Sequence, residues 1–280
     1  MTELRRRMIE DMQLRGLSPT TQQRYLEKIK ILANHFNRSP DQLSEQEIRD
    51  FFVYLNQEGC LARSTIRVYV FAVKFLYQKT LQRKWPVLNL IRVKPSKKLP
   101  VVLSPKEVRA VLSHVHRSDV RLCLIMMYSC GLRISEAIHL RPTDIDSQRM
   151  VVCVRNGKGA KDRYVPLPQR TLEQLREYWY EYRPRIWLFP SRNVLNPLPR
   201  TTVHRALKAA CQQSNILKNV SCHTFRHSYA TILLEKEVDL RVIQALLGHR
   251  SVRSTFIYMH LTQGTMKKVH NTINKIMAYL

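Results

Sequence analysis

Apolar residues recur every three or four positions along almost the whole chain, a spacing typical of helices that bury one face. One long stretch interrupts this spacing. Residues 86–103 carry Pro86, Pro95 and Pro100 together with four basic residues and no acidic one. Because proline lacks a backbone N–H and disfavours helix in the residue before it, this stretch is predicted to be a basic linker. The sequence therefore predicts two domains, residues 1–85 and 104–280, joined by a linker at 86–103.

The first predicted domain is a bundle of about four helices. Ser18 followed by Pro19 marks one helix start, and a capping box from Ser44 to Glu47 marks another. Gly59 is expected to end the helix that the capping box begins. The remaining helices are expected over residues 3–15 and 62–79.

The second predicted domain is mainly helical with a small antiparallel β-sheet. A capping box from Ser104 to Glu107 restarts the helices, and a strongly apolar helix over 119–130 is expected to end at Gly131. Two short β-type runs, 149–155 and 162–167, flank a turn rich in glycine and lysine. Further helices are predicted near 168–182, 201–214, 224–235, 239–247, 251–259 and 265–278.

The charge of the chain predicts its partner. It has 47 Lys and Arg residues against 21 Asp and Glu residues, a net charge of +26, and the basic residues run along its whole length. Such a protein usually binds a polyanion, because phosphate binding releases counterions. Nucleic acid is therefore the expected partner, with a generally basic surface, as in some ribosomal proteins, as the alternative. The basic linker is expected to lie along a DNA backbone, with a nuclear-targeting motif as the less favoured alternative.

The six cysteines have no C-x-x-C spacing, so neither a zinc site nor a disulfide framework is expected. The first residues lack the apolar segment of a signal peptide, and the longest apolar run, near 122–128, is too short to span a bilayer. These features predict a cytoplasmic protein without a membrane-spanning segment.

Six residues could carry chemistry, although each has an ordinary structural explanation when taken alone. Arginines near helix starts, lysines at hairpin tips and half-buried tyrosines are common. His223 and His227 lie four apart on a predicted helix and could bind a metal, but Arg226 between them would repel a cation. The candidates in chain order are Arg133, Lys158, His223, Arg226, His249 and Tyr258.

Together these residue types match the needs of phosphodiester transfer, which are a nucleophile, stabilisation of the non-bridging oxygens and a proton donor for the leaving oxygen. Guanidinium groups bind phosphate oxygens in pairs, and histidines exchange protons near neutral pH. A tyrosine, whose ordinary pKa is about 10, needs a cationic pocket to attack as phenolate. The sequence shows no cluster of acidic metal ligands and no G-x-x-x-x-G-K-[ST] loop, so no metal and no nucleotide cofactor is expected.

Four segments resemble the tyrosine recombinase, or phage integrase, family and follow its order: GLRISEAIHL (131–140), GKGAKDRYVPLP (157–168), HTFRHSYATILLE (223–235) and IQALLGHRSVRSTFIYMH (243–260). Two earlier segments, GLSPTTQQRYL and ARSTIRVYVFAVKFLY, resemble its N-terminal core-binding domain. Among subgroups, the chain looks closest to the short Xer-like and the integron- or transposon-associated enzymes. The resemblance implies a SAM-like helical core-binding domain and a catalytic domain that form a C-shaped clamp on DNA.

The resemblance also implies roles for the candidates. Tyr258 would attack the scissile phosphate, forming a 3′-phosphotyrosine and releasing a 5′-hydroxyl. Arg133 and Arg226 would clamp that phosphate, and Lys158 would protonate the 5′-oxygen.

The remaining roles concern protons and positioning. His223 would act in proton transfer at the tyrosine, His249 would hydrogen-bond the phosphate, and Glu136 would orient the arginines. His227 is expected to be structural. Phe256 and Met259 stand where smaller or polar residues are commoner in the family, which would alter packing around the nucleophile.

The implied partner is double-stranded DNA with paired inverted core sites. The residues expected to contact it are Arg63, Ser64, Thr65, Arg67, Lys97 and Lys98, although the first four could equally be an ordinary solvated helix start. After Tyr258 an apolar stripe formed by Met266, Val269, Ile273 and Ile276 could pack on its own domain or, by resemblance, dock on the next protomer of a homotetramer. The same chemistry serves type IB topoisomerases and telomere resolvases, and a catalytically idle DNA-binding regulator is a further alternative.

Overall fold

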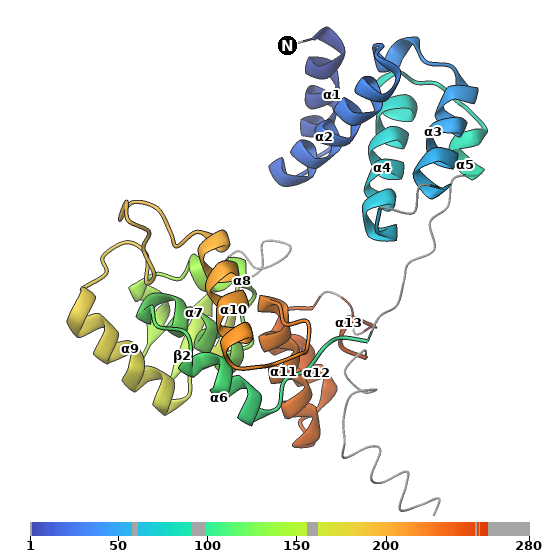
Figure 1. The fold of residues 1–280 in the computed structure, drawn as a ribbon. Coiled ribbons are helices and arrows are strands. Elements are labelled where there is room, and N and C mark those ends of the chain that lie inside the picture. The colour runs from blue at the N-terminus through green and yellow to red at the C-terminus, as the bar shows by residue number, and fades with distance from the viewer. Residues whose placement is uncertain are drawn as a thin grey trace, which may run out of the picture. The chain divides into compact units, whose positions relative to one another are not determined.

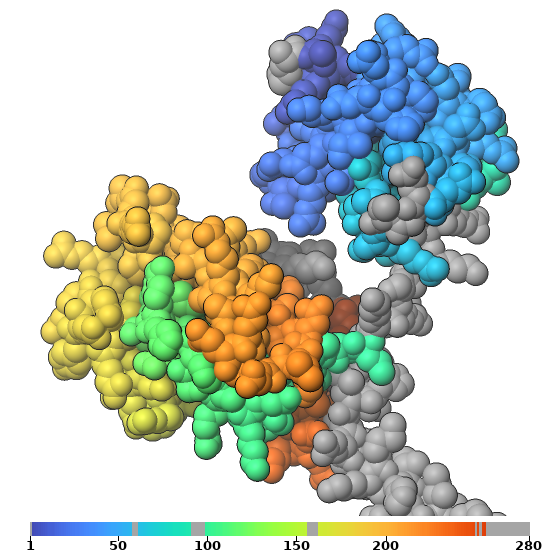
Figure 2. Space-filling view, in the orientation of Figure 1, coloured from blue at the N-terminus to red at the C-terminus, as the bar shows by residue number. Residues whose placement is uncertain are grey.

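The computed structural model describes residues 2–57, 61–90, 99–155, 162–249, 251 and 253–256 (Figure 1). The chain divides into two compact units, Met1–Lys98 and Leu99–Leu280. Both are closely packed in the space-filling view (Figure 2). Within the described ranges, no helix is both long and apolar enough to cross a bilayer.

The first unit is a helical bundle, as the sequence predicts. Its helices begin where the capping signals lie: the Ser18 side chain accepts from the Thr21 N–H, and Ser44 and Glu47 exchange side-chain and backbone hydrogen bonds. The elements are α1 (Glu3–Leu14), α2 (Pro19–Phe36), η1 (Pro40–Gln42), α3 (Glu45–Gln57), α4 (Arg63–Phe75), η2 (Leu76–Thr80) and α5 (Val87–Leu90).

The helix predicted at 62–79 ends in a widened π-type turn, η2. The turn buries Leu76 and Tyr77 completely, and the Tyr77 hydroxyl donates to the carbonyl of Pro40 at 2.6 Å. Trp85 stacks on the Tyr77 ring with their centroids 4.6 Å apart. These contacts hold the chain against the bundle up to the predicted start of the linker.

The range predicted to be the linker, 86–103, contains buried residues at both ends. Val87 and Leu88 of α5 are buried in the core of the first unit. Leu103 belongs to the core of the second unit, and its N–H donates to the Ser228 hydroxyl at 2.9 Å. Apolar side chains close to the prolines therefore extend both units into this range.

The second unit is mainly helical with a small antiparallel sheet. Its core surrounds α7, which is buried on most sides by α8, α9, α10 and α11 (Figure 1). The helical elements are α6 (Pro105–Ser113), α7 (Ser118–Ser129), α8 (Ile134–Ile138), η3 (Pro142–Asp144), α9 (Gln169–Tyr182), α10 (Arg200–Gln213), α11 (Cys222–Glu235), α12 (Leu240–Leu247) and α13 (Arg253–Phe256).

Three strands form the sheet in the order β1 (Ile145–Asp146), β2 (Val151–Val154) and β3 (Arg163–Pro166). Both pairings are antiparallel, and Val152 lies opposite Val165 on the buried face. The predicted pair of strands is confirmed, whereas the sequence pattern does not predict β1 or the five-residue helix α8.

Candidate active site

Five of the predicted site residues lie in the described part of the second unit: Arg133, Glu136, His223, Arg226 and His249. Hydrogen bonds and ion pairs join Glu136 to both arginines, and both arginines bind the chain immediately before His249. Lys158 and Tyr258 lie outside the described residues. The structure thus brings the described candidates together at one place.

Arg133 reaches the site from the start of α8. Gly131, two residues earlier, has a φ of +63°, and a Cβ there would lie 2.6 Å from the ring of Tyr229. Only glycine combines this backbone conformation with so close an approach. The turn ends α7 as predicted and leads directly to Arg133 at the N-cap of α8.

Glu136 is the centre of the site. Its carboxylate accepts from the backbone N–H of Arg133 at 2.7 Å and from Nη1 of Arg133 at 2.6 Å. It also accepts two hydrogen bonds from Arg163, at 3.0 and 2.8 Å, and lies 3.7 Å from Nη1 of Arg226. The Glu136 side chain is 6% exposed, so three guanidinium groups surround one buried carboxylate.

This carboxylate is ionised near pH 7. Burial alone would raise the pKa of Glu136, but the hydrogen bonds and charge of Arg163, and then the N–H and charge of Arg133, lower it to about 2. A permanent negative charge therefore orients the arginines.

Arg226 comes from the first turns of α11 and is almost fully buried, with 3% of its side chain exposed. It donates to the carbonyl of Gly131 at 2.7 Å and to that of Leu247. A charged group is held in such surroundings only when polar partners replace water. Arg226 thereby connects the end of α7 to the end of α12.

His249 directly follows the left-handed Gly248 that ends α12. Burial, and then the charges of Arg226 and Arg133, lower the pKa of His249 to about 4. The pKa of His223 is lowered for the same reasons in the same order, burial first and Arg226 and Arg133 next. Both rings are therefore neutral near pH 7 and can donate or accept a proton.

His227 also lies beside the site. Burial and then the charges of His223 and Arg226 lower its pKa to about 4. Its ring centroid is 6.3 Å from that of His223. Within the part of the chain that the structure describes, no three His, Cys, Asp or Glu side chains gather as metal ligands.

The predicted DNA contacts of the first unit lie at the start of α4. Arg63, Ser64 and Arg67 are exposed, and Thr65 is partly so. The guanidinium of Arg67 lies 5.4 Å from the ring centroid of Phe71, which is itself 45% exposed. Lys97 and Lys98 lie outside the described residues.

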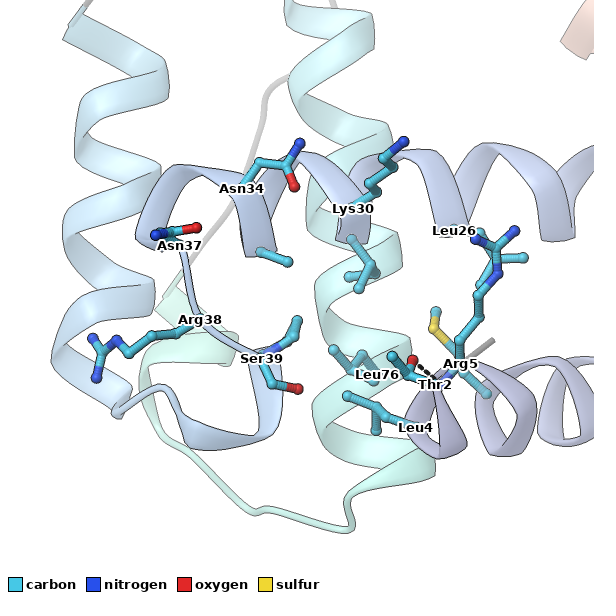
Figure 3. A pocket seen from close by; sticks show the side chains of 14 residues that line it. Thr2, Leu4, Arg5, Leu26, Lys30, Asn34, Asn37, Arg38, Ser39 and Leu76 are labelled. Carbon is cyan, nitrogen blue, oxygen red and sulfur yellow. Dashed lines mark hydrogen bonds between the residues drawn. The ribbon is translucent and has the colours of Figure 1, made fainter.

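A hollow of about 440 Å³ in the first unit contains none of the predicted site residues (Figure 3). Its walls are apolar at Leu4, Leu26 and Leu76, with Arg5 and Lys30 among the polar side chains around them. The chemistry predicted from the sequence is therefore not located in this hollow.

Two residues of the site escape the sequence-based prediction, Arg163 and Thr255. Arg163 shares the inward face of β3 with Val165, and an arginine on a buried strand face needs an acidic partner. The alternation of inward and outward side chains along β3 could therefore have identified Arg163 from the sequence. Thr255 is fully buried in α13, and its hydroxyl lies 2.9 Å from Nδ1 of His249. No local pattern marks such a contact.

Comparison with family models identifies two matches. Residues 101–264 match the model described as "Phage integrase family". Residues 4–87 match the model described as "Phage integrase, N-terminal SAM-like domain". Together they cover most of both units.

Among known proteins, the chain is similar to y4qK of Sinorhizobium fredii, named as a putative integrase/recombinase, with 46% identity covering 93% of this chain and 85% of that protein. It is 31% identical to the tyrosine recombinase XerD of Staphylococcus aureus, covering 92% and 93%. The solved structure of XerA recombinase matches with a TM-score of 0.56 and 26% identity, covering 97% of this chain and 98% of XerA.

Proposed function

Because this chain belongs to the phage integrase family and is a tyrosine-type site-specific DNA recombinase, we propose that Tyr258 is its nucleophile and that Arg133 and Arg226 hold the scissile phosphate. The observation that carries the proposal is the attachment of both arginines to one ionised carboxylate, Glu136, immediately beside His249. Neither an idle DNA-binding regulator nor a relaxing topoisomerase is favoured by this family membership.

In the cleavage step, Oη of Tyr258 attacks the phosphorus and the bond from phosphorus to the 5′-oxygen breaks. His223 accepts the phenol proton, and Lys158 donates a proton to the leaving 5′-oxygen. Arg133 and Arg226 stabilise the charge that develops on the non-bridging oxygens, and His249 hydrogen-bonds one of them. The products are a 3′-phosphotyrosine and a free 5′-hydroxyl.

In the joining step, the 5′-hydroxyl of a second strand attacks the phosphotyrosine and releases Tyr258. One phosphodiester bond is exchanged for another, so the reaction needs no external energy source. Two successive exchanges pass through a Holliday junction. The neutral state of His223 at pH 7 fits a group that accepts a proton and later returns it.

The proposal extends to the assembly. Arg63, Ser64, Thr65 and Arg67, with Lys97 and Lys98 of the linker, would contact the backbone of double-stranded DNA that carries paired inverted core sites. The two domains would clamp the duplex, and the stripe formed by Met266, Val269, Ile273 and Ile276 would dock on the next protomer of a homotetramer. A cytoplasmic location is part of the same proposal.

The first prediction concerns the nucleophile. With nicked suicide duplexes made from DNA flanking its own gene, the protein should form a covalent complex that survives a denaturing gel. Tyr258→Phe should lower the yield of this complex by at least about 1,000-fold, because no other group supplies the attacking oxygen. Tyr180→Phe, a change at a tyrosine that is 69% exposed on α9, should leave it unchanged. A covalent band that persists in Tyr258→Phe would overturn the assignment.

A further inference from the structure

The C-terminal end of α12 is held by three arginines. Three consecutive carbonyls there each accept a hydrogen bond from a different guanidinium: Leu246 from Nε of Arg163 at 2.8 Å, Leu247 from Nη2 of Arg226, and Gly248 from Nη2 of Arg133 at 3.1 Å. The end of a helix carries partial negative charge, so cations are favoured there. The same three arginines surround Glu136.

Arg163 differs from the other two arginines because its side chain donates to both oxygens of Glu136. Its two terminal nitrogens bind the two oxygens of Glu136 as a parallel fork, and its Nε binds the end of α12. Its side chain is only 11% exposed. A Cβ on Gly248 would lie 3.1 Å from Nη1 of Arg163, so the turn before His249 is packed directly against this guanidinium.

We propose that Arg163 is a positioning residue for strand cleavage: its fork on Glu136 and its hydrogen bond to α12 set the arginine pair and His249 around the phosphate. This inference rests on the roles proposed above for Arg133, Arg226 and His249. Arg163 also begins β3, the strand that follows the segment carrying Lys158. One side chain thus ties that strand to α8 and to α12.

The charges of this cluster predict what the removal of Arg163 would do. Three guanidinium groups and one carboxylate give the cluster a net charge of +2 (three positive minus one negative). Without Arg163, Glu136 loses two hydrogen-bond donors and is left with Arg133 and Arg226 as its charged partners. Both would be drawn toward the carboxylate, and each would then be less well placed to stabilise charge on the phosphate.

The test compares two substrates that differ at the scissile position. One is an ordinary suicide duplex. In the other, a methyl group replaces one non-bridging oxygen, which removes the negative charge that the arginines stabilise. The full-length protein is measured as wild type, Arg163→Ala and Arg163→Lys. Arg149→Ala is the matched control, because Arg149 is an exposed arginine whose guanidinium stacks on Tyr164 of the same strand as Arg163.

Arg163→Ala should slow covalent complex formation on the ordinary duplex by about 100-fold, the scale of losing one preorganised stabilising group. On the methyl-substituted duplex the loss should be less than about tenfold, since there is less charge to stabilise. Arg163→Lys keeps the charge without the fork and should lose about tenfold on the ordinary duplex. Duplex affinity should change little in all variants.

A merely structural role would slow cleavage of both duplexes by the same factor, and that result would overturn the inference. So would a wild-type rate in Arg163→Ala. If Arg163→Ala melts below the assay temperature, the losses of rate on the two duplexes are compared for Arg163→Lys instead. An equal loss on both duplexes then refutes the proposal. Failure of the wild type to form a covalent complex would count instead against the proposed function.

Discussion

Thr255 lies fully buried in α13, and its hydroxyl is 2.9 Å from Nδ1 of His249. A neutral imidazole has one donor and one acceptor nitrogen, and the partner of one determines the state of the other. If the Thr255 hydroxyl donates to Nδ1, the proton of His249 is on Nε2, where it can be donated to a phosphate oxygen. In that arrangement the Thr255 hydroxyl orients His249, whose lowered pKa keeps the ring neutral near pH 7.

Thr255→Val, which keeps the shape and removes the hydroxyl, should slow covalent complex formation by about tenfold through loss of this orienting hydrogen bond. Thr231→Val is the matched control. Thr231 is equally buried on α11, and among the described residues its hydroxyl has no hydrogen-bond partner. That variant should cleave at the wild-type rate. Equal rates for the two variants would show that Thr255 does not orient His249.

At the scale of elements, α11 and the segment just after α12 each carry a histidine that the fold keeps neutral. His227 of α11 has a pKa of about 4, and so does His249 after α12, whereas an unfolded histidine titrates near 6.5. The folded-state pKa is the lower one, so the unfolded chain takes up protons first as the pH falls. The stabilisation is complete above about pH 6.5 and is lost as the pH falls toward 4.

We therefore expect the free energy of unfolding to fall by about 2 kcal/mol between pH 7 and pH 5, a figure already reduced for the partial exposure of both rings. Chemical unfolding of the full chain at each pH measures this loss. Between pH 7 and pH 5, the free energy of unfolding of His227→Gln should fall by about half as much as that of the wild type. His116→Gln, a change at an exposed histidine, should show the same fall as the wild type. Stability that rises toward pH 5 would show that uptake of protons by these two rings does not control the pH dependence.

The helices and strands also differ in how well the sequence predicts them. Capping residues such as Ser44 and Ser104 act within three positions of the helix start, so α3 and α6 begin where the sequence predicts. The helix α8 has five residues and β1 has two, too few for a period to be recognised. In the π-type turn η2, the Tyr77 hydroxyl donates to the carbonyl of Pro40, 37 residues away. Long-range partners decide such features.

In the candidate active site, too, local contacts can be predicted from the sequence and long-range contacts cannot. Arg133 and Glu136 are three residues apart, and their pairing follows from local helix geometry. Arg163 and Glu136 are 27 residues apart, and no spacing rule joins them. Family resemblance supplies the candidates that are far apart in sequence, but it does not supply Arg163 or Thr255.

At the scale of the whole molecule, positive charge is abundant and negative charge is scarce, with 47 basic residues against 21 acidic ones. Such an excess lets a folded chain bind a phosphate backbone through counterion release. It also opposes the meeting of two copies, since like charges repel. The homotetramer proposed above would therefore need an apolar contact to hold the copies together, and DNA to neutralise their charge.

The apolar stripe of residues 266–276 is the segment proposed to make that contact, and it lies outside the described residues. Truncation after Thr262 keeps Tyr258 and removes the stripe. We expect the truncated protein to bind a single core site with wild-type affinity and to form paired-site complexes at least about tenfold less well, because docking links protomers only in the assembly. Native gel shift with one-site and two-site duplexes separates the two effects.

Ile273→Asp should reproduce the truncation, whereas Asn274→Asp, which adds the same charge beside the stripe, should not. Paired-site complexes at normal yield from the truncated protein would show that the stripe packs on its own domain, leaving another surface to join the protomers.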